Sequence, residues 1–356
     1  MDSEEDRMLY ISFNQDNTCF AVGTERGYRI YNLQTPNLDF YERIMDGGIG
    51  LIEMLYRSNI LALVGGGKYP KYPLNKVIIW DDNHGKAITE LSFNGYVNNV
   101  KLKKDKIIIV CDKQIFVFNL LNLTQIDVID FDTIENKKGL IAITLESKIG
   151  MIAYPDKANG YVRIKRYDTG KKLLINAHDK PISALCFSRD SKYLATTSSE
   201  GIYLRVFKTD KGVFLYEFQI GKYSVEVLGL SFDNDDNFLA CSTEGGGISI
   251  FKLNAVKEKE SKLEEEHEEE HNEDDLVKMP QQSIWSKLFT RDEGAFASLK
   301  VPEKKEIATF ASGSYGKNRI CVVGSEGKFY LARFDVNVGG MAIKEEEKSL
   351  GINQYE

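Results

Sequence analysis

The stretch NAHDKPISALCFSRDSKYLATTSSEGIYLRVFKTDKGVFLYEFQIGKYSVEVLGLSFDNDDNFLACSTEGGGISIFKL, residues 176–253, contains one pattern twice. Each copy has a polar turn (SRDS, DNDD), an apolar run that ends in small residues (YLATTSS, FLACST), a turn with glycine, and an apolar run that closes on an aromatic residue (RVFKT, ISIFKL). Short runs rich in β-branched and aromatic residues between Gly, Asn and Asp turns are typical of β-strands. The stretch therefore predicts a repeated all-β unit.

The same unit recurs seven times along the chain. Its copies start at Phe13, Tyr56, Val100, Thr144, Phe187, Phe232 and Phe310. The first five intervals are 43 to 45 residues long, and the sixth, 78 residues, contains the extra segment 254–294. A period of about 40–45 residues with four strands in each repeat is the signature of a WD-type β-propeller, and the Trp-Asp dipeptide itself occurs at Trp80-Asp81. We expect an all-β, seven-bladed WD40-type β-propeller over residues 1–350, a ring without free sheet edges, followed by the tail 351–356.

Negative charge is concentrated in one segment of the chain. Of the net charge of −7 over 356 residues, the run KEKESKLEEEHEEEHNEDD, residues 257–275, contributes −8, which leaves the remainder near +1. A near-neutral body lacks the basic face of a nucleic-acid-binding protein. The acidic run has almost nothing apolar to bury, so residues 254–294 are predicted to form a disordered acidic insert in the sixth blade.

The cysteines and the absence of targeting signals bear on location. The five cysteines are an odd number without close pairing, which indicates a reducing compartment. The sequence begins without a secretory signal and contains no apolar stretch long enough to span a membrane. We expect a soluble cytoplasmic protein.

No arrangement of residues in the sequence favours catalysis. His84 and His178 lie in a turn and at the start of a repeat, without a nucleophile and base arranged around them. His267 and His271 have the spacing of a zinc-binding pair on a helix, but a solvated acidic loop is the simpler interpretation. The run GGGK, residues 65–68, lacks the Gly-Lys-Ser/Thr order of a phosphate-binding loop. We expect no enzymatic activity, no cofactor and no metal site.

An apolar cluster follows the acidic run. In QSIWSKLF, residues 282–289, the side chains of Ile284, Trp285, Leu288 and Phe289 would share one face of a short helix. Such a cluster on a projecting loop suits insertion into a membrane interface or into a groove of a partner. Packing back onto the side of the propeller is the alternative.

These stretches together resemble the PROPPIN family, the phosphoinositide-binding propellers that include the WIPI proteins of autophagy. The resemblance runs from Tyr10 to Leu350 outside the acidic insert. It is carried by FNQD (13–16), by the segment 47–82 with GGGKYPKYPLNKVIIWDD, by residues 175–207 and by VVGSEGKFYLARFD (322–335). It implies a monomeric, non-enzymatic scaffold that binds phosphatidylinositol 3-phosphate and recruits an autophagy lipid-transfer protein. The implied location is cytoplasmic and peripheral, at preautophagosomal, endosomal or vacuolar membranes.

The lipid-binding motif of the family, Phe-Arg-Arg-Gly, stands in this chain as Phe218-Gln219-Ile220-Gly221, so both arginines are replaced. The fork of an arginine donates two charge-assisted hydrogen bonds to one phosphate. Gln219 can donate one neutral hydrogen bond and Ile220 none. A hydrogen bond to a charged group is worth roughly 1.5–3 kcal/mol, so each replacement is expected to weaken its pocket by about one to two powers of ten.

The resemblance leaves a reduced set of pocket residues. The first pocket keeps Thr196, Ser198 and Arg205, the second keeps Ser242 and Thr243, and Lys222 stands next to the motif as a partial substitute for an arginine. In the second pocket Gly247 and Ser249 replace a hydroxyl and a histidine of the family. The alternative is that Arg205 and the hydroxyls satisfy backbone groups of the blade turns.

The resemblance also implies a protein-binding edge. Asn14 and Asp16 of FNQD lie on the first-blade edge that it associates with the lipid-transfer protein, and an Asx turn before a strand is the alternative role. Two functions remain open on the sequence. One is a scaffold that still binds phosphatidylinositol 3-phosphate membranes weakly, and the other is a lipid-blind adaptor that keeps only protein binding.

Overall fold

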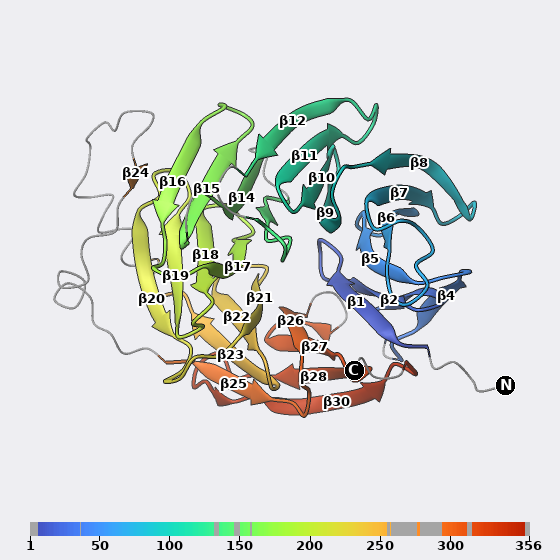
Figure 1. The fold of residues 1–356 in the computed structure, drawn as a ribbon. Coiled ribbons are helices and arrows are strands. Elements are labelled where there is room, and N and C mark those ends of the chain that lie inside the picture. The colour runs from blue at the N-terminus through green and yellow to red at the C-terminus, as the bar shows by residue number, and fades with distance from the viewer. Residues whose placement is uncertain are drawn as a thin grey trace. The chain divides into compact units, whose positions relative to one another are not determined.

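The strands of this chain form seven sheets, each built on four strands (Figure 1). The computed structural model describes residues 6–35, 37–131, 135–145, 150–156, 159–254, 257, 276–277, 294–311 and 315–352. Every named element within these residues is a β-strand. The all-β, seven-bladed architecture expected from the repeats is confirmed.

The sheets follow one another along the sequence. The first three are β1 (Met8–Phe13), β2 (Cys19–Thr24), β3 (Gly27–Asn32) and β4 (Phe40–Ile44); β5 (Ile49–Met54), β6 (Ile60–Gly65), β7 (Lys76–Asp81) and β8 (Lys86–Ser92); and β9 (Val97–Lys103), β10 (Lys106–Cys111), β11 (Gln114–Asn119) and β12 (Gln125–Asp130). The fourth and fifth are β13 (Ala142–Ile143), β14 (Met151–Pro155), β15 (Tyr161–Arg166) and β16 (Lys172–Asn176), joined by β24 (Leu276–Val277); and β17 (Ile182–Phe187), β18 (Tyr193–Ser198), β19 (Tyr203–Lys208) and β20 (Phe214–Gln219). The sixth and seventh are β21 (Val227–Phe232), β22 (Phe238–Thr243), β23 (Gly247–Lys252) and β25 (Ala297–Lys300), joined by β29 (Gly340–Met341); and β26 (Glu306–Phe310), β27 (Arg319–Gly324), β28 (Lys328–Arg333) and β30 (Ile343–Ser349).

Each sequence repeat is offset from a sheet by one strand. The repeat that starts at Phe187 begins where β17 ends and contains β18, β19 and β20. It therefore supplies the last three strands of the fifth sheet and the first strand of the sixth. The polar turn that opens each repeat is the connection between the first and second strands of a sheet.

The second strand of each sheet explains the apolar runs of the pattern. All residues of β18 (YLATTS) and β22 (FLACST) are buried. A strand covered on both faces cannot show polar alternation, so its sequence is apolar or small throughout. The outer strand β8 (KAITELS) is half-exposed or exposed along its whole length, and its sequence mixes polar with apolar residues.

The chain divides into two compact units. One comprises Met1–Gly139, Ala311–Ala332 and Lys344–Glu356, and the other comprises Leu140–Phe310 and Arg333–Ile343. Each has its own apolar clusters, one of which, in the second unit, contains Leu204, Phe218 and Phe251. The expected single domain over residues 1–350 stays a prediction.

The expected acidic insert falls almost wholly outside the described residues. Of residues 254–294 the structure describes Asn254, Lys257, Gly294 and the strand β24, whose backbone pairs in parallel with β16. The apolar cluster of Ile284, Trp285, Leu288 and Phe289, the histidines His267 and His271, and the tail beyond residue 352 also lie outside the described residues.

Glu306 is a buried carboxyl at the start of β26. It is 2 % exposed, and neither of its oxygens makes a hydrogen bond of standard geometry within the described residues. Burial raises its pKa to about 8, against the opposing effects of the Gly246 amide and the Lys300 ammonium. The folded protein therefore holds this proton at neutral pH, whereas the unfolded chain releases it near the ordinary value of 4.5.

We expect the substitution Glu306→Gln to remove a pH-dependent loss of stability. Between about pH 4.5 and pH 8 the folded protein binds more protons than the unfolded chain, so its free energy of unfolding falls as pH rises through this window. The glutamine has no proton to lose. Calorimetric Tm values should therefore favour the variant above about pH 8, and its advantage should shrink towards pH 5. Parallel Tm curves for the two proteins would contradict the assignment.

Candidate functional site

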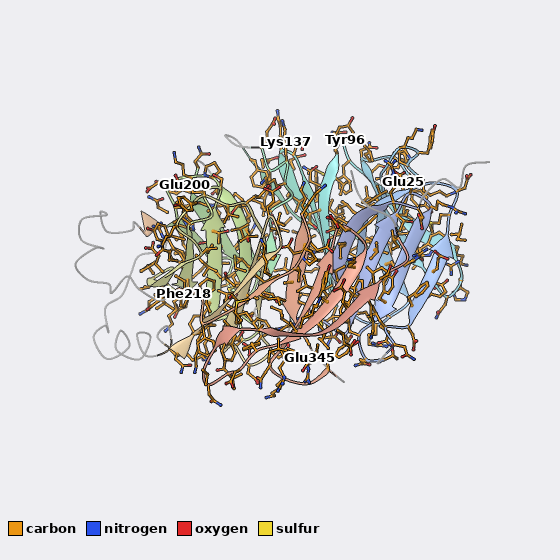
Figure 2. The ribbon with its side chains drawn as sticks, turned by 90° about the horizontal axis from the view of Figure 1, so that it is seen from below. Glu25, Tyr96, Lys137, Glu200, Phe218 and Glu345 are labelled. Atoms are coloured by element: carbon orange, nitrogen blue, oxygen red, sulfur yellow. The ribbon has the colours of Figure 1, made fainter. Side chains whose placement is uncertain are left out.

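The motif Phe218–Gly221 begins on β20, the outer strand of the fifth sheet. Figure 2 labels Phe218. Its side chain is 1 % exposed, and it lies opposite Leu204 of β19. Its ring centroid is 5.0 Å from that of Phe251 on β23. Phe218 therefore packs between the fifth and sixth sheets, so the residue that the motif retains at its first position is a core residue.

The two positions that lack arginine differ in their surroundings. Gln219 is exposed, and its Nε2 donates a hydrogen bond of 3.2 Å to the carbonyl oxygen of Gly221. The amide of Ile220 donates to the carbonyl oxygen of Ile202 at 2.8 Å, and its side chain packs against the same core cluster as Phe218. Neither residue presents a cation.

A projecting turn follows the motif. Backbone hydrogen bonds fix both ends of this turn. The amide of Ile220 holds the first end, and the amide of Val225 holds the second by donating to the carbonyl oxygen of Glu200 at 3.1 Å. Between them, Lys222 and Tyr223 are exposed. The role of Lys222 as a partial substitute for an arginine stays a prediction.

The glycine that this turn requires is Gly201. A Cβ atom on Gly201 would lie 1.8 Å from the carbonyl oxygen of Val225, and its φ is +62°. A Cβ atom on Gly221 would meet only the carbonyl oxygen of Tyr223, at 3.8 Å. Close packing therefore admits only glycine at position 201, whereas a side chain can be accommodated at position 221.

Arg205 of the first pocket is already engaged within the protein. It lies on β19 between Thr196 of β18 and Glu217 of β20. Its Nε donates to Oε2 of Glu217 at 2.7 Å, and one of its terminal nitrogens donates to the carbonyl oxygen of Ala177, also at 2.7 Å. The half-buried guanidinium thus has an internal carboxylate as its counter-ion.

The hydroxyl of Thr196 is engaged as well. Thr196 is fully buried, and its Oγ1 lies 3.0 Å from Nε2 of the buried His178. Burial, together with the nearby charge of Arg205, lowers the pKa of His178 to about 3, so its ring is neutral at physiological pH. Ser198 ends β18, and its carbonyl oxygen accepts a hydrogen bond of 2.8 Å from Ser183.

The second pocket contains hydroxyls with mainly backbone partners. Thr243 Oγ1 donates to the carbonyl oxygen of Gly247 at 3.0 Å, and Ser242 Oγ lies 3.5 Å from the carbonyl oxygen of Gly229. Ser249 lies on β23 opposite Cys241. The Thr243 hydroxyl therefore satisfies a backbone group, which is the alternative role for these hydroxyls.

Two exposed glutamates lie on the segments that adjoin this second pocket. The amide of Glu244 donates to the carbonyl oxygen of Glu226 at 2.8 Å, and both side chains are exposed. The ammonium of Lys300 is bound to the carbonyl oxygen of Gly245. Carboxylates in this position disfavour an approaching phosphate.

In the first unit, the FNQD turn holds three sheets together. Asn14 is buried, accepts hydrogen bonds from the amides of Thr18 and Cys19 at 2.9 and 3.0 Å, and donates to the carbonyl oxygen of Tyr56 at 3.2 Å. Asp16 is partly exposed and accepts from the amide and hydroxyl of Thr18 at 3.1 and 2.6 Å. Asn14 therefore has a structural role, and Asp16 is the member of the pair that is accessible.

Four residues, Glu217, His178, Gly201 and Gln15, have roles in these sites that the sequence does not show. Glu217 precedes the motif directly, and its pairing with Arg205 depends on the register of β19 and β20. His178 and Gly201 act through tertiary contacts. Gln15 donates to the carbonyl oxygens of Met54 and Leu102 at 2.6 and 3.0 Å, which joins the second and third sheets to the first. Only the polar character of Gln15 within FNQD signals such a role.

The described residues offer neither a metal site nor a membrane-spanning helix. They contain no group of three or more His, Cys, Asp or Glu side chains placed to hold a metal ion. No helix among them is long and apolar enough to cross a membrane.

A family model described as PROPPIN matches residues 8–350. The chain belongs to the PROPPIN family. It is 29 % identical over 350 residues to autophagy-related protein 18e of Arabidopsis thaliana, covering 96 % of this chain and 87 % of that protein. It is 32 % identical over 246 residues to SVP1-like protein 2 of Neurospora crassa, covering 69 % of this chain and 56 % of that protein.

The solved structures that resemble this PROPPIN show its fold. The structure described as Kluyveromyces lactis Hsv2 with complete loop 6CD has a TM-score of 0.75 at 21 % identity, covering 97 % of this chain and 99 % of that one. The complex of KlAtg21 with the coiled coil of AgAtg16 has a TM-score of 0.72 at 20 % identity, covering 96 % and 99 %.

We expect Phe218 to matter for folding and Gln219 not to. Replacing a buried aromatic ring by alanine costs about 3–5 kcal/mol, so urea unfolding of Phe218→Ala should show a loss of this size. Gln219→Ala, on the exposed face of the same strand, is the matched control and should change stability by less than about 0.5 kcal/mol. A small effect of Phe218→Ala would contradict the packing described for β20.

Proposed function

We propose that the protein is a non-enzymatic PROPPIN scaffold of autophagy that binds phosphatidylinositol 3-phosphate membranes weakly and brings a lipid-transfer protein to them. Its family and its similarity to autophagy-related protein 18e support the role in autophagy. We place it in the cytoplasm, as a monomer that associates peripherally with preautophagosomal, endosomal or vacuolar membranes.

We expect lipid binding to be weak because Arg205 is already paired with Glu217. Arg205 is the arginine that remains in the first pocket, and its Nε–H is already donated to the Glu217 carboxylate at 2.7 Å, so it is not free for a phosphate oxygen. A phosphate must displace Glu217 or lie beside it, and like charges repel. The second pocket has neither of the family arginines, and Thr243 donates its hydrogen bond internally.

Restoring the motif should strengthen binding to vesicles. The double variant Gln219→Arg, Ile220→Arg supplies both forks, and we expect its affinity for vesicles with phosphatidylinositol 3-phosphate to rise by about ten- to a hundredfold for each pocket that it repairs. Co-sedimentation with vesicles that contain or lack the lipid measures this. If the double variant gains nothing, the proposed pockets do not exist.

Removing the internal counter-ion should strengthen binding through the first pocket alone. In Glu217→Gln the guanidinium of Arg205 loses its carboxylate partner, so we expect a several-fold gain in sedimentation that requires phosphatidylinositol 3-phosphate. Glu42→Gln is the matched control, because Glu42 pairs with Arg29 at 2.6 Å on an outer strand of the first unit. An equal change in both variants would contradict a role of Arg205 in phosphate binding.

The lipid-blind adaptor remains the second candidate, favoured by the complete burial of the Thr196 hydroxyl against His178. The two candidates differ in the behaviour of the natural chain. A weak binder sediments with phosphatidylinositol 3-phosphate vesicles at high lipid concentration. An adaptor stays in solution at every concentration, while the double arginine variant sediments.

Two substitutions in the FNQD turn should distinguish partner binding from structural stability. Asn14→Ala leaves buried amides and a carbonyl oxygen without a partner, so we expect it to lower the free energy of unfolding by about 1–3 kcal/mol. Asp16→Ala should cost less stability and should still reduce recruitment of the lipid-transfer protein, measured by affinity capture with the folded variants. Normal recruitment by Asp16→Ala would remove Asp16 from the proposed interface.

A further inference from the structure

A rigid turn in the second unit exposes three apolar side chains. It comprises residues 335–343, DVNVGGMAI, and is called the rim turn below. Val338, Met341 and Ile343 are 81 %, 71 % and 63 % exposed. Single exposed apolar residues are normal on protein surfaces, but three within six residues form a contiguous patch of the kind that marks an interaction site.

Hydrogen bonds hold the base of the rim turn. The Asp335 carboxylate accepts from the amides of Asn337 and Val338 at 2.8 and 3.1 Å, which lowers its pKa. The amide of Gly339 donates to the carbonyl oxygen of Asp335 at 2.9 Å. Gly339 has φ +72°, and a Cβ atom there would lie 2.1 Å from the carbonyl oxygen of Phe296, so only glycine fits.

The rest of the rim turn is fixed to the sixth sheet. Its strand β29 pairs with β25, and the amides of Gly340 and Ala342 donate to carbonyl oxygens of that sheet at 2.8 Å. Ala342 is buried. Since side chains alternate along an extended strand, Met341 and Ile343 both face outward. The patch is therefore held in place and loses little conformational entropy when it is covered.

Basic side chains accompany the patch. The ammonium of Lys252 donates to the carbonyl oxygen of Val336 at 3.3 Å and lies 5.1 Å from the ring centroid of Phe296. Arg333, just before the turn, is exposed. The exposed carboxylate of Asp335 offsets one of these two positive charges, which leaves a small net positive charge beside the apolar side chains. Apolar side chains beside a net positive charge suit the interface of a bilayer, where acyl chains lie beneath phosphate headgroups.

We propose that the rim turn inserts Val338, Met341 and Ile343 into the interface of a lipid bilayer, independently of the phosphoinositide headgroup. This inference rests on the proposed membrane function and adds a second contact to it. The turn pairs through β29 with β25, the strand that follows the segment with Ile284, Trp285, Leu288 and Phe289. For that segment the sequence offers membrane insertion as one of its roles, beside a partner's groove and packing against the propeller. Phe289 precedes Ala297 by eight residues, so at most about 29 Å of extended chain separates it from this pairing.

The test uses the full chain held at a membrane by other means. An amino-terminal hexahistidine tag tethers the protein to phosphatidylcholine vesicles with a nickel-chelating lipid, so the turn meets a bilayer whether or not the pockets bind. Val338→Cys carries an environment-sensitive fluorophore. Burial raises the pKa of all five native thiols, so the introduced thiol is labelled selectively. Leu121→Cys, at an equally exposed position of the first unit, is the matched control.

We expect a blue shift of the label at position 338 on tethering and none at position 121. Without a tether, the triple variant Val338→Ser, Met341→Ser, Ile343→Ser in the double arginine background should bind vesicles with phosphatidylinositol 3-phosphate about tenfold or more weakly than the double arginine variant alone. An unshifted label at position 338 on tethered protein overturns the inference, and would assign the patch to a protein partner. Failure of the natural chain to sediment, with a shifted label on tethering, instead overturns only the proposed lipid recognition.

Discussion

The alternation of side chains along β20 links the fold to the candidate site. Because Phe218 points into the core between two sheets, its neighbours on the strand, Glu217 and Gln219, must point the other way. The same register places Glu217 opposite Arg205. The motif cannot slip by one residue without exposing an aromatic ring and burying a charge, so the core fixes which side chains the pocket can present.

The pairing of Arg205 with Glu217 sets folding against ligand binding. The guanidinium is half-buried, and removing its partner would leave a charge with poor hydration. The carboxylate therefore stabilises the strand pair β19–β20 while it neutralises the charge that a phosphate needs. Two further arginines would add positive charge beyond what Glu217 compensates. With Gln219 and Ile220 in their places, the pair of Arg205 and Glu217 adds no net charge to the proposed first pocket. In the proposed function, replacement of the motif therefore lowers lipid affinity by more than the lost contacts of the two residues.

Much of the fold can be predicted from local sequence patterns, whereas little of the candidate site can. The seven repeats and the strand-rich runs follow from residue types and a period of 43 to 45 residues. The burial of Phe218, named in the sequence only as part of the lipid-binding motif, became visible in the structure. The pairing of Arg205 with Glu217, the contact of His178 with Thr196 and the bonds of Gln15 to two other sheets depend on register and on residues up to 87 positions apart. A sequence shows that these side chains are polar. Only their positions in space show that they bind one another before any ligand arrives.

In the proposed function, a weak pocket and a small apolar turn would bind a membrane more strongly together than either would alone. Both the first pocket and the rim turn belong to the second unit, so once one of them touches a membrane, the other meets it at a high effective concentration. The second contact then does not incur the full loss of translational freedom. Membrane affinity shared between two weak contacts would depend less on a single lipid headgroup. Each weak contact would also dissociate quickly. For the scaffold proposed above, loss of the two arginines would speed release from the membrane, because tight headgroup binding slows dissociation.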